Sequence, residues 1–269
     1  MNQLQLGMLG VTLVLLRTGP LNFRDIAVAA WFTLCLAFKP SLVWCVVLVV
    51  FDAWLAGRHT QLKRLAIGGF IGTVSAMILS MPWFTIRDWL EWSCSVWNLP
   101  DEIIRTEIGN ISIAITLIDQ GLIPRWLPWL VSLALATLVA VISNCHRQRC
   151  GSAGDLSVDE TAHTAFILAI GCLIPLLMSR LIWYHYLVLA IPSMLIIISR
   201  IENLIRRDRV QAVALTSLVL WSLLLLGIAP VDNYFSADAV ERSVRVAFAV
   251  AFLLSMTLCF FQIGVSDAT

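Results

Sequence analysis

Nine apolar runs follow one another along this chain, and most of its polar residues are confined to the segments between them. The runs cover residues 4–16, 26–38, 41–56, 65–81, 126–143, 164–178, 184–199, 210–228 and 244–262. A helix that crosses a bilayer needs about 20 mainly apolar residues, and polar neighbours lengthen shorter runs by snorkelling. The pattern predicts an all-α, polytopic transmembrane helical bundle of about nine spans, some short, with residues 1–269 forming a single transmembrane domain.

The composition agrees with this class. Of the 269 residues, 59% are hydrophobic and 13% are charged, which leaves too little polar surface to cover a soluble globule. Eleven Trp suit helix ends at two membrane–water interfaces. The formal net charge is +1, and no Lys/Arg run resembles a nucleic-acid footprint, so we expect a lipid bilayer and no nucleic acid among the partners.

Motifs for soluble-nucleotide chemistry are missing. The sequence has no P-loop, GxGxxG, GxSxG or HExxH, and we expect neither a cofactor nor a metal. The stretch "CHRQRC" (145–150) holds two Cys and one His. It lacks a fourth ligand and the usual spacing of a metal site, so we interpret it as a solvated loop.

Pro40 separates the second apolar run from the third. Proline has no amide hydrogen for a continuing helix and disfavours helix at the preceding residue, Lys39. The sequence therefore predicts a tight reversal at Lys39-Pro40-Ser41 instead of one long helix.

The basic residues divide unequally between the two sets of loops. Eleven lie in one set: Arg17, Arg24, Arg58, Lys63, Arg64, Arg147, Arg149, Arg200, Arg206, Arg207 and Arg209. Seven lie in the other: Lys39, Arg87, Arg105, Arg125, Arg180, Arg242 and Arg245. The positive-inside rule places the first set in the cytoplasm, the N-terminus outside and the C-terminus inside.

The segment 82–125 is too long to be a simple connector. In "TIRDWLEWSCSVW", Trp89, Trp92 and Val96 recur at three- and four-residue steps, which predicts an amphipathic helix in the outer interface. "EIGNISIAITLID" follows, with a Gly-Asn turn at its start and Asp119 at its end. The outer segment either shapes the entry of a lipid-borne substrate or is only a lid that lies against the membrane surface.

Polar residues from four separate segments fall on the predicted outer face. These segments are Asn2-Gln3, Lys39-Pro40, 82–125 and Ser179–His185. In "SRLIWYHYLVLAIP" (179–192), the guanidinium of Arg180 is suited to bidentate phosphate contacts, and His185 to phosphate binding or proton transfer. Lys39 either pairs with a lipid phosphate or snorkels to water. These groups predict a basic, aromatic outer cavity for a lipid phosphate or pyrophosphate.

Four stretches carry a resemblance to a known family. "NQLQLGMLGVTLVLL", "LAFKPSLVWCVVLVV", "GNISIAI" and "RLIWYHYLVLAIP" resemble, in order and approximate spacing, glycosyltransferase family 87. That family belongs to the GT-C superfamily of membrane glycosyltransferases that use polyprenyl-phosphate sugars. The resemblance covers most of residues 2–192, while the last two apolar runs match only as hydrophobic spans.

The resemblance implies roles for individual residues. Those that match the family's motifs are Gln3, Lys39 with Pro40, Asn110 with Ser112, and His185 between Trp183 and Tyr186. The family has an Asn two residues after this Gln, whereas here Leu4 and Gln5 follow Gln3, so the Asn is not matched. Tyr184 stands where an acidic residue often precedes the family's His.

The catalytic residues stay unknown at this stage. GT-C enzymes carry their catalytic carboxylate in the first outer loop, and the resemblance implies that this chain begins beyond that point, so we expect a portion that lacks the family's N-terminal part. Asp88 and Glu91 are the nearest local carboxylates. We favour an exposed role on the interfacial helix for both.

The resemblance implies a hexosyltransferase-like enzyme of the plasma (inner) membrane. We expect it to transfer a hexosyl or pentosyl group from a polyprenyl-phosphate donor to a glycan or lipid acceptor on the non-cytoplasmic face. The predicted substrate-binding residues are Lys39, Arg180, His185, Asn110 and Gln3. A transporter or flippase of a lipid-linked glycan and a non-catalytic scaffold are the alternatives. A transporter needs ionisable groups near the midplane, whereas snorkelling from span ends explains the three candidates Asp52, Glu241 and Arg245.

Overall fold

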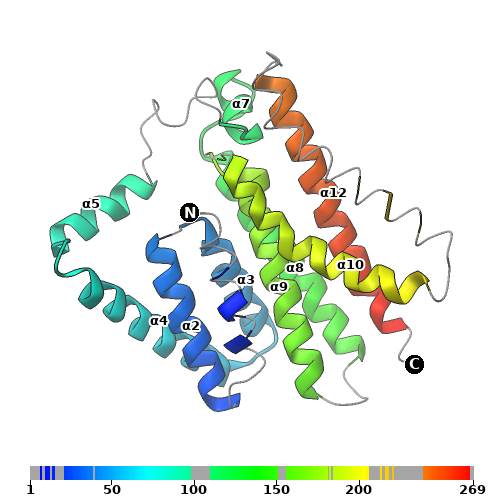
Figure 1. Ribbon diagram of the computed structural model, residues 1–269, viewed down its shortest axis with the longest axis horizontal. Helices are drawn as coiled ribbons and strands as arrows, with labels where there is room; N and C mark the ends of the chain where they lie inside the picture. Colours follow the sequence, from blue (N-terminus) through cyan, green and yellow to red (C-terminus); the bar gives the residue numbers. More distant parts are fainter. Residues whose placement is uncertain are drawn as a thin grey trace.

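The structure is a computed structural model, and every element in the part of the chain that it describes is helical (Figure 1). The described residues are 7, 10–12, 14–15, 21–38, 40–97, 110–150, 156–180, 182, 184–205, 213, 216–217, 220 and 239–266. The all-α prediction is confirmed for these residues.

The helices follow most of the predicted runs. They are α2 (Leu21–Phe38), η1 (Pro40–Leu42), α3 (Val43–Leu55), α4 (His59–Ser80), α5 (Ile86–Trp97), α7 (Ile113–Asp119), α8 (Leu127–Cys150), α9 (Leu156–Met178), η3 (Tyr184–Ala190), α10 (Ile191–Ile205) and α12 (Ala239–Ser266), where η marks a 3-10 helix. The predicted runs 4–16 and 210–228 lie mostly outside the described residues.

Two described helices are long and apolar enough to cross a membrane. They are α4 and the segment Leu127–Cys145 of α8. The segments Pro40–Leu55, His163–Met178 and Ser243–Leu258 are apolar but shorter. The coarse expectation of apolar, membrane-length helices is confirmed, and the count of nine spans stays a prediction.

The predicted break at Pro40 is present. Helix α2 ends at Phe38, and the 3-10 turn Pro40–Leu42 leads into α3. Gly68 of α4 lies against Ile26 of α2, and Gly72 lies against Ala30, so residue numbers increase together along both helices. Because α2 and α4 therefore run parallel, the intervening α3 runs back between their ends, as the reversal requires.

Small residues let α2 and α4 approach closely. Gly68, Gly72 and Ala76 recur every four residues, so they share one face of α4. A Cβ atom on Gly68 would lie 2.3 Å from the Ile26 carbonyl oxygen, and one on Gly72 would lie 2.3 Å from that of Ala30. Such small-residue contacts are typical of helix pairs in membranes, where close packing and interhelical hydrogen bonds drive association.

A glycine turn ends α3 and directs the chain back toward it. Gly57 has φ 67°, its N–H donates to the Trp54 carbonyl at 3.0 Å, and the Arg58 N–H donates to the Ala53 carbonyl at 2.9 Å. These two bonds form a Schellman motif, which needs a residue with positive φ at the glycine position. The turn brings Arg58 back to Asp52, one turn of helix before the end of α3, and the two side chains form an ion pair.

Helix α9 lies against α3, α8, α10 and α12 and supplies much of the buried core (Figure 1). Its residues Ile170, Leu173 and Ile174 are fully buried. At Gly171 the helix passes so close to α3 that a Cβ atom would lie 2.6 Å from the Cα atom of Cys45. The core of the bundle therefore depends on a second close glycine contact.

Two boundaries differ from the sequence interpretation. Helix α2 begins at Leu21, so Arg24 is a buried helical residue and not a loop residue. Helix α8 continues to Cys150, so the stretch 145–150, interpreted as a solvated loop, is helical. In both cases the helix extends into a charged stretch that periodicity in apolar residues does not detect.

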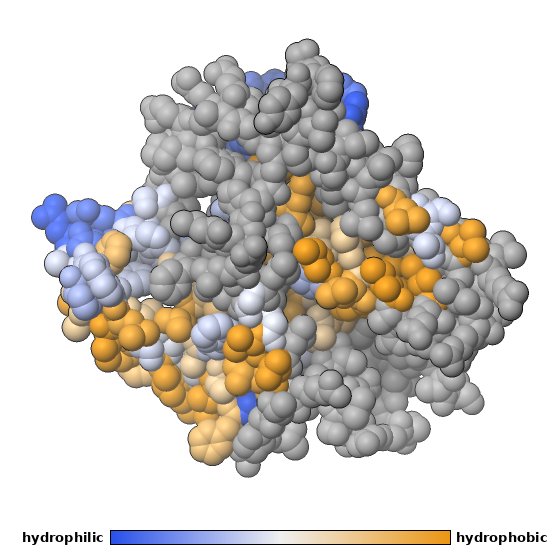
Figure 2. Space-filling view, in the orientation of Figure 1, coloured by the Kyte–Doolittle hydropathy of each residue, from blue (hydrophilic) through white to orange (hydrophobic). Residues whose placement is uncertain are grey.

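An apolar stripe runs along the outward face of α4. Its exposed members follow the i, i+3, i+4, i+7 pattern of one helix face and are Ile67, Phe70, Ile71, Val74, Met77, Ile78 and, just after the helix, Met81. Figure 2 shows apolar surface at the lower left of the view, where α4 lies in Figure 1. A helix whose outward face is apolar over this length is suited to contact with lipid chains.

The close contact between α2 and α4 predicts a difference between neighbouring glycines. Gly72→Ala should destabilise the bundle by about 1–3 kcal/mol, because the added methyl group meets backbone atoms that cannot move aside. Thermal unfolding in detergent measures the effect. Gly69→Ala is the matched control, since its Cβ atom would only touch the Thr33 hydroxyl at 3.6 Å. Equal stability of the two variants would contradict the packing described.

Candidate functional site

Two non-helical segments, far apart in the sequence, meet at one end of the bundle. The Ile111 N–H donates to the Ile182 carbonyl at 2.8 Å. The Asn110 side-chain NH2 donates to the Arg180 carbonyl at 2.8 Å, and its oxygen accepts the Ile182 N–H at 2.9 Å. We call this region, which comprises 110–112, 179–180 and 182, the Asn110 clamp. It brings together two stretches that the sequence analysis assigned to the outer face.

An asparagine suits this position because its amide offers a donor and an acceptor at once. The Asn110 oxygen also accepts the Ser112 N–H at 3.2 Å, and the residue is only 2% exposed. Buried backbone groups outside helices need such partners, since each unpaired group costs free energy. Asn110 therefore holds the crossing of the two segments, and a direct contact with substrate stays a prediction.

Ser112 and Thr116 connect the clamp to two helices. The Ser112 hydroxyl donates to the Ser179 carbonyl and accepts the Ile115 N–H at 3.3 Å, so it is the N-cap of α7. One turn further along α7, the hydroxyls of Thr116 and Ser243 lie 3.0 Å apart. The clamp thus fixes α7 against the end of α9 and against α12, and α7 lies at the top of Figure 1.

The five predicted substrate-binding residues differ in how far the structure describes them. Asn110 and Arg180 are brought together, with Arg180 contributing its backbone carbonyl to the clamp. The backbone of His185 lies in η3, the 3-10 helix that follows the clamp. The side chain of His185 and the whole of Lys39 and Gln3 lie outside what the structure describes.

The helix predicted in this segment is present as α5, its location in the interface stays a prediction, and its two carboxylates have local partners. The Asp88 carboxylate accepts the Thr85 N–H at 2.6 Å, and the Asp88 N–H donates to the Thr85 hydroxyl at 3.3 Å. This reciprocal pair is a capping box. The bonds from the backbone and hydroxyl of Thr85 lower the pKa of Asp88, which makes the carboxylate a weaker base.

Glu91 pairs along the same helix. Its carboxylate lies 2.8 Å from the Arg87 guanidinium in an exposed i,i+4 ion pair. Both acidic residues therefore serve the helix itself, in agreement with the role favoured from the sequence.

A polar cluster lies at the end of the bundle opposite the clamp, and it was not predicted from the sequence. The Asp52 carboxylate is buried, binds Arg58, and lies 3.1 Å from His163 Nε2. The Ser143 hydroxyl lies 3.1 Å from the same nitrogen. Snorkelling to solvent was the wrong interpretation for Asp52, whereas Glu241 and Arg245 do form an exposed pair.

The cluster has the residue types of a nucleophilic triad without its geometry. In a Ser-His-Asp triad the serine and the aspartate contact different ring nitrogens of the histidine. Here the Ser143 hydroxyl and the Asp52 carboxylate both contact Nε2, and they lie 3.3 Å from each other. The arrangement ties α3, α8 and α9 together, and it does not relay a proton from the serine through the ring.

The comparisons with known proteins give no family to which the chain can be assigned: no family model, no curated protein and no solved structure matches it. In the part of the chain that the structure describes, the fold is all-α, two helices have membrane-spanning length, and a clamp of buried polar groups lies at one end of the bundle. Function is therefore inferred from these features.

The clamp predicts a specific loss of stability. Asn110→Ala leaves the Ile182 N–H and the Arg180 carbonyl without their side-chain partner, so the free energy of unfolding should fall by about 1–3 kcal/mol. Thermal or denaturant unfolding measures this change. Gln120→Ala, at an exposed position near the end of α7, should change stability by less than about 0.5 kcal/mol. A variant Asn110→Ala as stable as the control would contradict the clamp.

Proposed function

We propose that this chain is a multi-pass protein of the plasma (inner) membrane that acts as a GT-C-type glycosyltransferase, or as the C-terminal portion of one. It transfers a sugar from a polyprenyl-phosphate donor to a glycan or lipid acceptor. The reaction takes place on the non-cytoplasmic face, at the end of the bundle that holds the Asn110 clamp.

The observation that carries this proposal is the clamp. Asn110 and Arg180 are 70 residues apart in the chain, yet a hydrogen bond of 2.8 Å joins them. They belong to "GNISIAI" and "RLIWYHYLVLAIP", two of the stretches that resemble the glycosyltransferase family. A shared site requires that these two stretches lie close together in space, and the sequence resemblance alone does not show that they do.

The chemistry at this end of the bundle suits an anionic lipid substrate. Arg180 supplies a guanidinium, whose planar fork of N–H donors matches phosphate oxygens. In the proposal Arg180, Lys39 and His185 bind the donor phosphate, while Asn110 holds the segment that carries Arg180 and Gln3 lines the same site. A retained phosphate leaving group needs such cationic partners.

The α4 stripe and the basic residues support the membrane orientation. The stripe faces outward along a helix long enough to cross a bilayer. Arg58, Lys63 and Arg64 lie at the end of the bundle opposite the clamp, near the start of α4. The excess of basic residues on that side favours its placement in the cytoplasm.

A transporter or flippase of a lipid-linked glycan is the second candidate, and one observation favours it. Asp52 and His163 are both buried within the bundle and share a 3.1 Å contact. Ionisable residues inside membrane bundles often mark ion or proton pathways. The cluster lies far from the clamp along α9, so the two candidate functions depend on different residues.

The experiment that separates the candidates uses the purified protein in lipid vesicles. A labelled polyprenyl-phosphate sugar should bind, and free polyprenyl phosphate should be released when acceptor is present. Arg180→Gln should weaken donor binding about 10- to 150-fold, which corresponds to the loss of one charge-assisted hydrogen bond. Arg245→Gln is the control, because this arginine pairs with Glu241 on the surface of α12.

The outcomes differ for the two candidates. Movement of intact donor across the bilayer, lost in Asp52→Asn and retained in Arg180→Gln, would support the transporter and contradict the transferase. Failure of the wild-type protein to bind the donor would contradict the proposal as a whole.

A further inference from the structure

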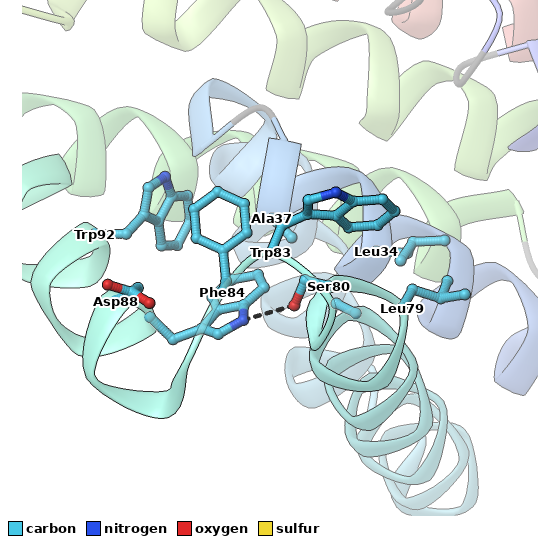
Figure 3. Close-up of a pocket in the computed structure, with 10 residues that line it drawn as sticks. Leu34, Ala37, Leu79, Ser80, Trp83, Phe84, Asp88 and Trp92 are labelled. Atoms are coloured by element: carbon cyan, nitrogen blue, oxygen red, sulfur yellow. Dashed lines mark hydrogen bonds between the residues drawn. The ribbon is translucent and has the colours of Figure 1, made fainter.

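A pocket of about 230 Å³ lies between α2, α4 and α5 (Figure 3). Leu34 and Ala37 form its wall on α2, and Ala76 and Leu79 form its wall on α4. Aromatic rings from the turn after α4 and from α5 complete it. Since α2 and α4 run parallel and the pocket involves the last turns of both, it lies near the end of the bundle that holds the Asn110 clamp.

The polar groups beside the pocket bind one another. The indole N–H of Trp89 donates to the Ser80 hydroxyl at 2.8 Å, the bond drawn as a dashed line in Figure 3. The rings of Trp89 and Trp92 meet edge to face, with centroids 5.5 Å apart. The capping box between Thr85 and Asp88 fixes the turn that folds α5 over the end of α4. The result is a preformed cavity with an almost wholly apolar lining.

The pocket has a floor inside the bundle and a mouth on its surface. Ala76 is 7% exposed, whereas Leu79, Trp83 and Phe84 are 63%, 77% and 53% exposed. Leu79 adjoins Ile78 and Met81, the last residues of the α4 stripe. The mouth is therefore continuous with the apolar stripe of α4.

We infer that this pocket binds one hydrocarbon chain of a bilayer phospholipid. The inference rests on the membrane embedding proposed above and is independent of glycosyl transfer. Around a membrane-embedded bundle, phospholipid chains are the most abundant apolar groups at the mouth, and a chain that enters gains dispersion contacts with the rings. Arg87 and Glu91 on the exposed side of α5 mark the level of the headgroups, where amphipathic helices lie.

Photo-crosslinking tests the inference on the full chain. The protein is reconstituted in phospholipid nanodiscs that contain a phospholipid with a diazirine at the end of one acyl chain. After irradiation, the labelled peptides are identified by mass spectrometry. Peptides that contain Leu34, Ala37 and 83–92 should carry at least fivefold more label than peptides from the exposed apolar surface of α8, which touches lipid without forming this pocket.

Ala37→Phe fills the pocket and should reduce its labelling at least fivefold while labelling of α8 stays unchanged. Val74→Phe also introduces a phenyl ring, but on the exposed stripe of α4, and should leave pocket labelling at the wild-type level. Trp92→Ala, which removes a ring from the wall, provides a second variant that does not depend on overpacking and should also lower the labelling. Thermal unfolding of each variant confirms that the bundle is intact.

Three results would overturn the inference. Pocket labelling no higher than that of α8 would show that no chain is held there. Displacement of the label by polyprenyl phosphate, but not by excess phospholipid, would assign the pocket to the lipid-linked substrate instead. An absence of label on the α4 stripe and on α8 would overturn the membrane embedding itself, and with it the proposed function.

Discussion

The hydrogen bonds of the Asn110 side chain are the interaction on which the proposed site depends. Just before α7 and just after α9 the chain is non-helical inside a buried part of the bundle, where its backbone groups have no helical partners. One amide satisfies three of them, on Arg180, Ile182 and Ser112. Without it, these three backbone groups lose their side-chain partner, and only the Ile111–Ile182 and Ser112–Ser179 bonds still join the two segments.

Close helix contacts and buried polar bonds join the other helices of the bundle. Gly68 and Gly72 bring α4 against α2, and Gly171 brings α9 against α3. At the end opposite the clamp, Asp52 and His163 join α3 and α9 through polar atoms. This combination is expected where the surroundings are as apolar as the core, because burial alone then provides little driving force.

Local features were predictable from the sequence, and long-range pairings were not. Pro40 predicts the break between α2 and α3, and the spacing of Trp89 and Trp92 predicts the amphipathic α5. The burial of Asp52 was missed because its partner His163 is 111 residues away in the chain and neither residue lies in a recognisable sequence motif. The structural role of Asn110 was missed for the same reason: a Gly-Asn pair predicts a turn, but it does not reveal which backbone atoms the amide binds.

The central claim is that the bundle crosses a membrane with the Asn110 clamp at its non-cytoplasmic end. Gln120 and Thr60 are exposed at opposite ends of the bundle, so each accepts a cysteine without disturbing the core. The test background carries Ser in place of the exposed Cys94 and Cys145, and the parent without an added cysteine controls for the remaining thiols. In intact cells, a membrane-impermeant maleimide should label Gln120→Cys at once and Thr60→Cys only after permeabilisation. Labelling of Thr60→Cys in intact cells, with Gln120→Cys protected, would contradict the account.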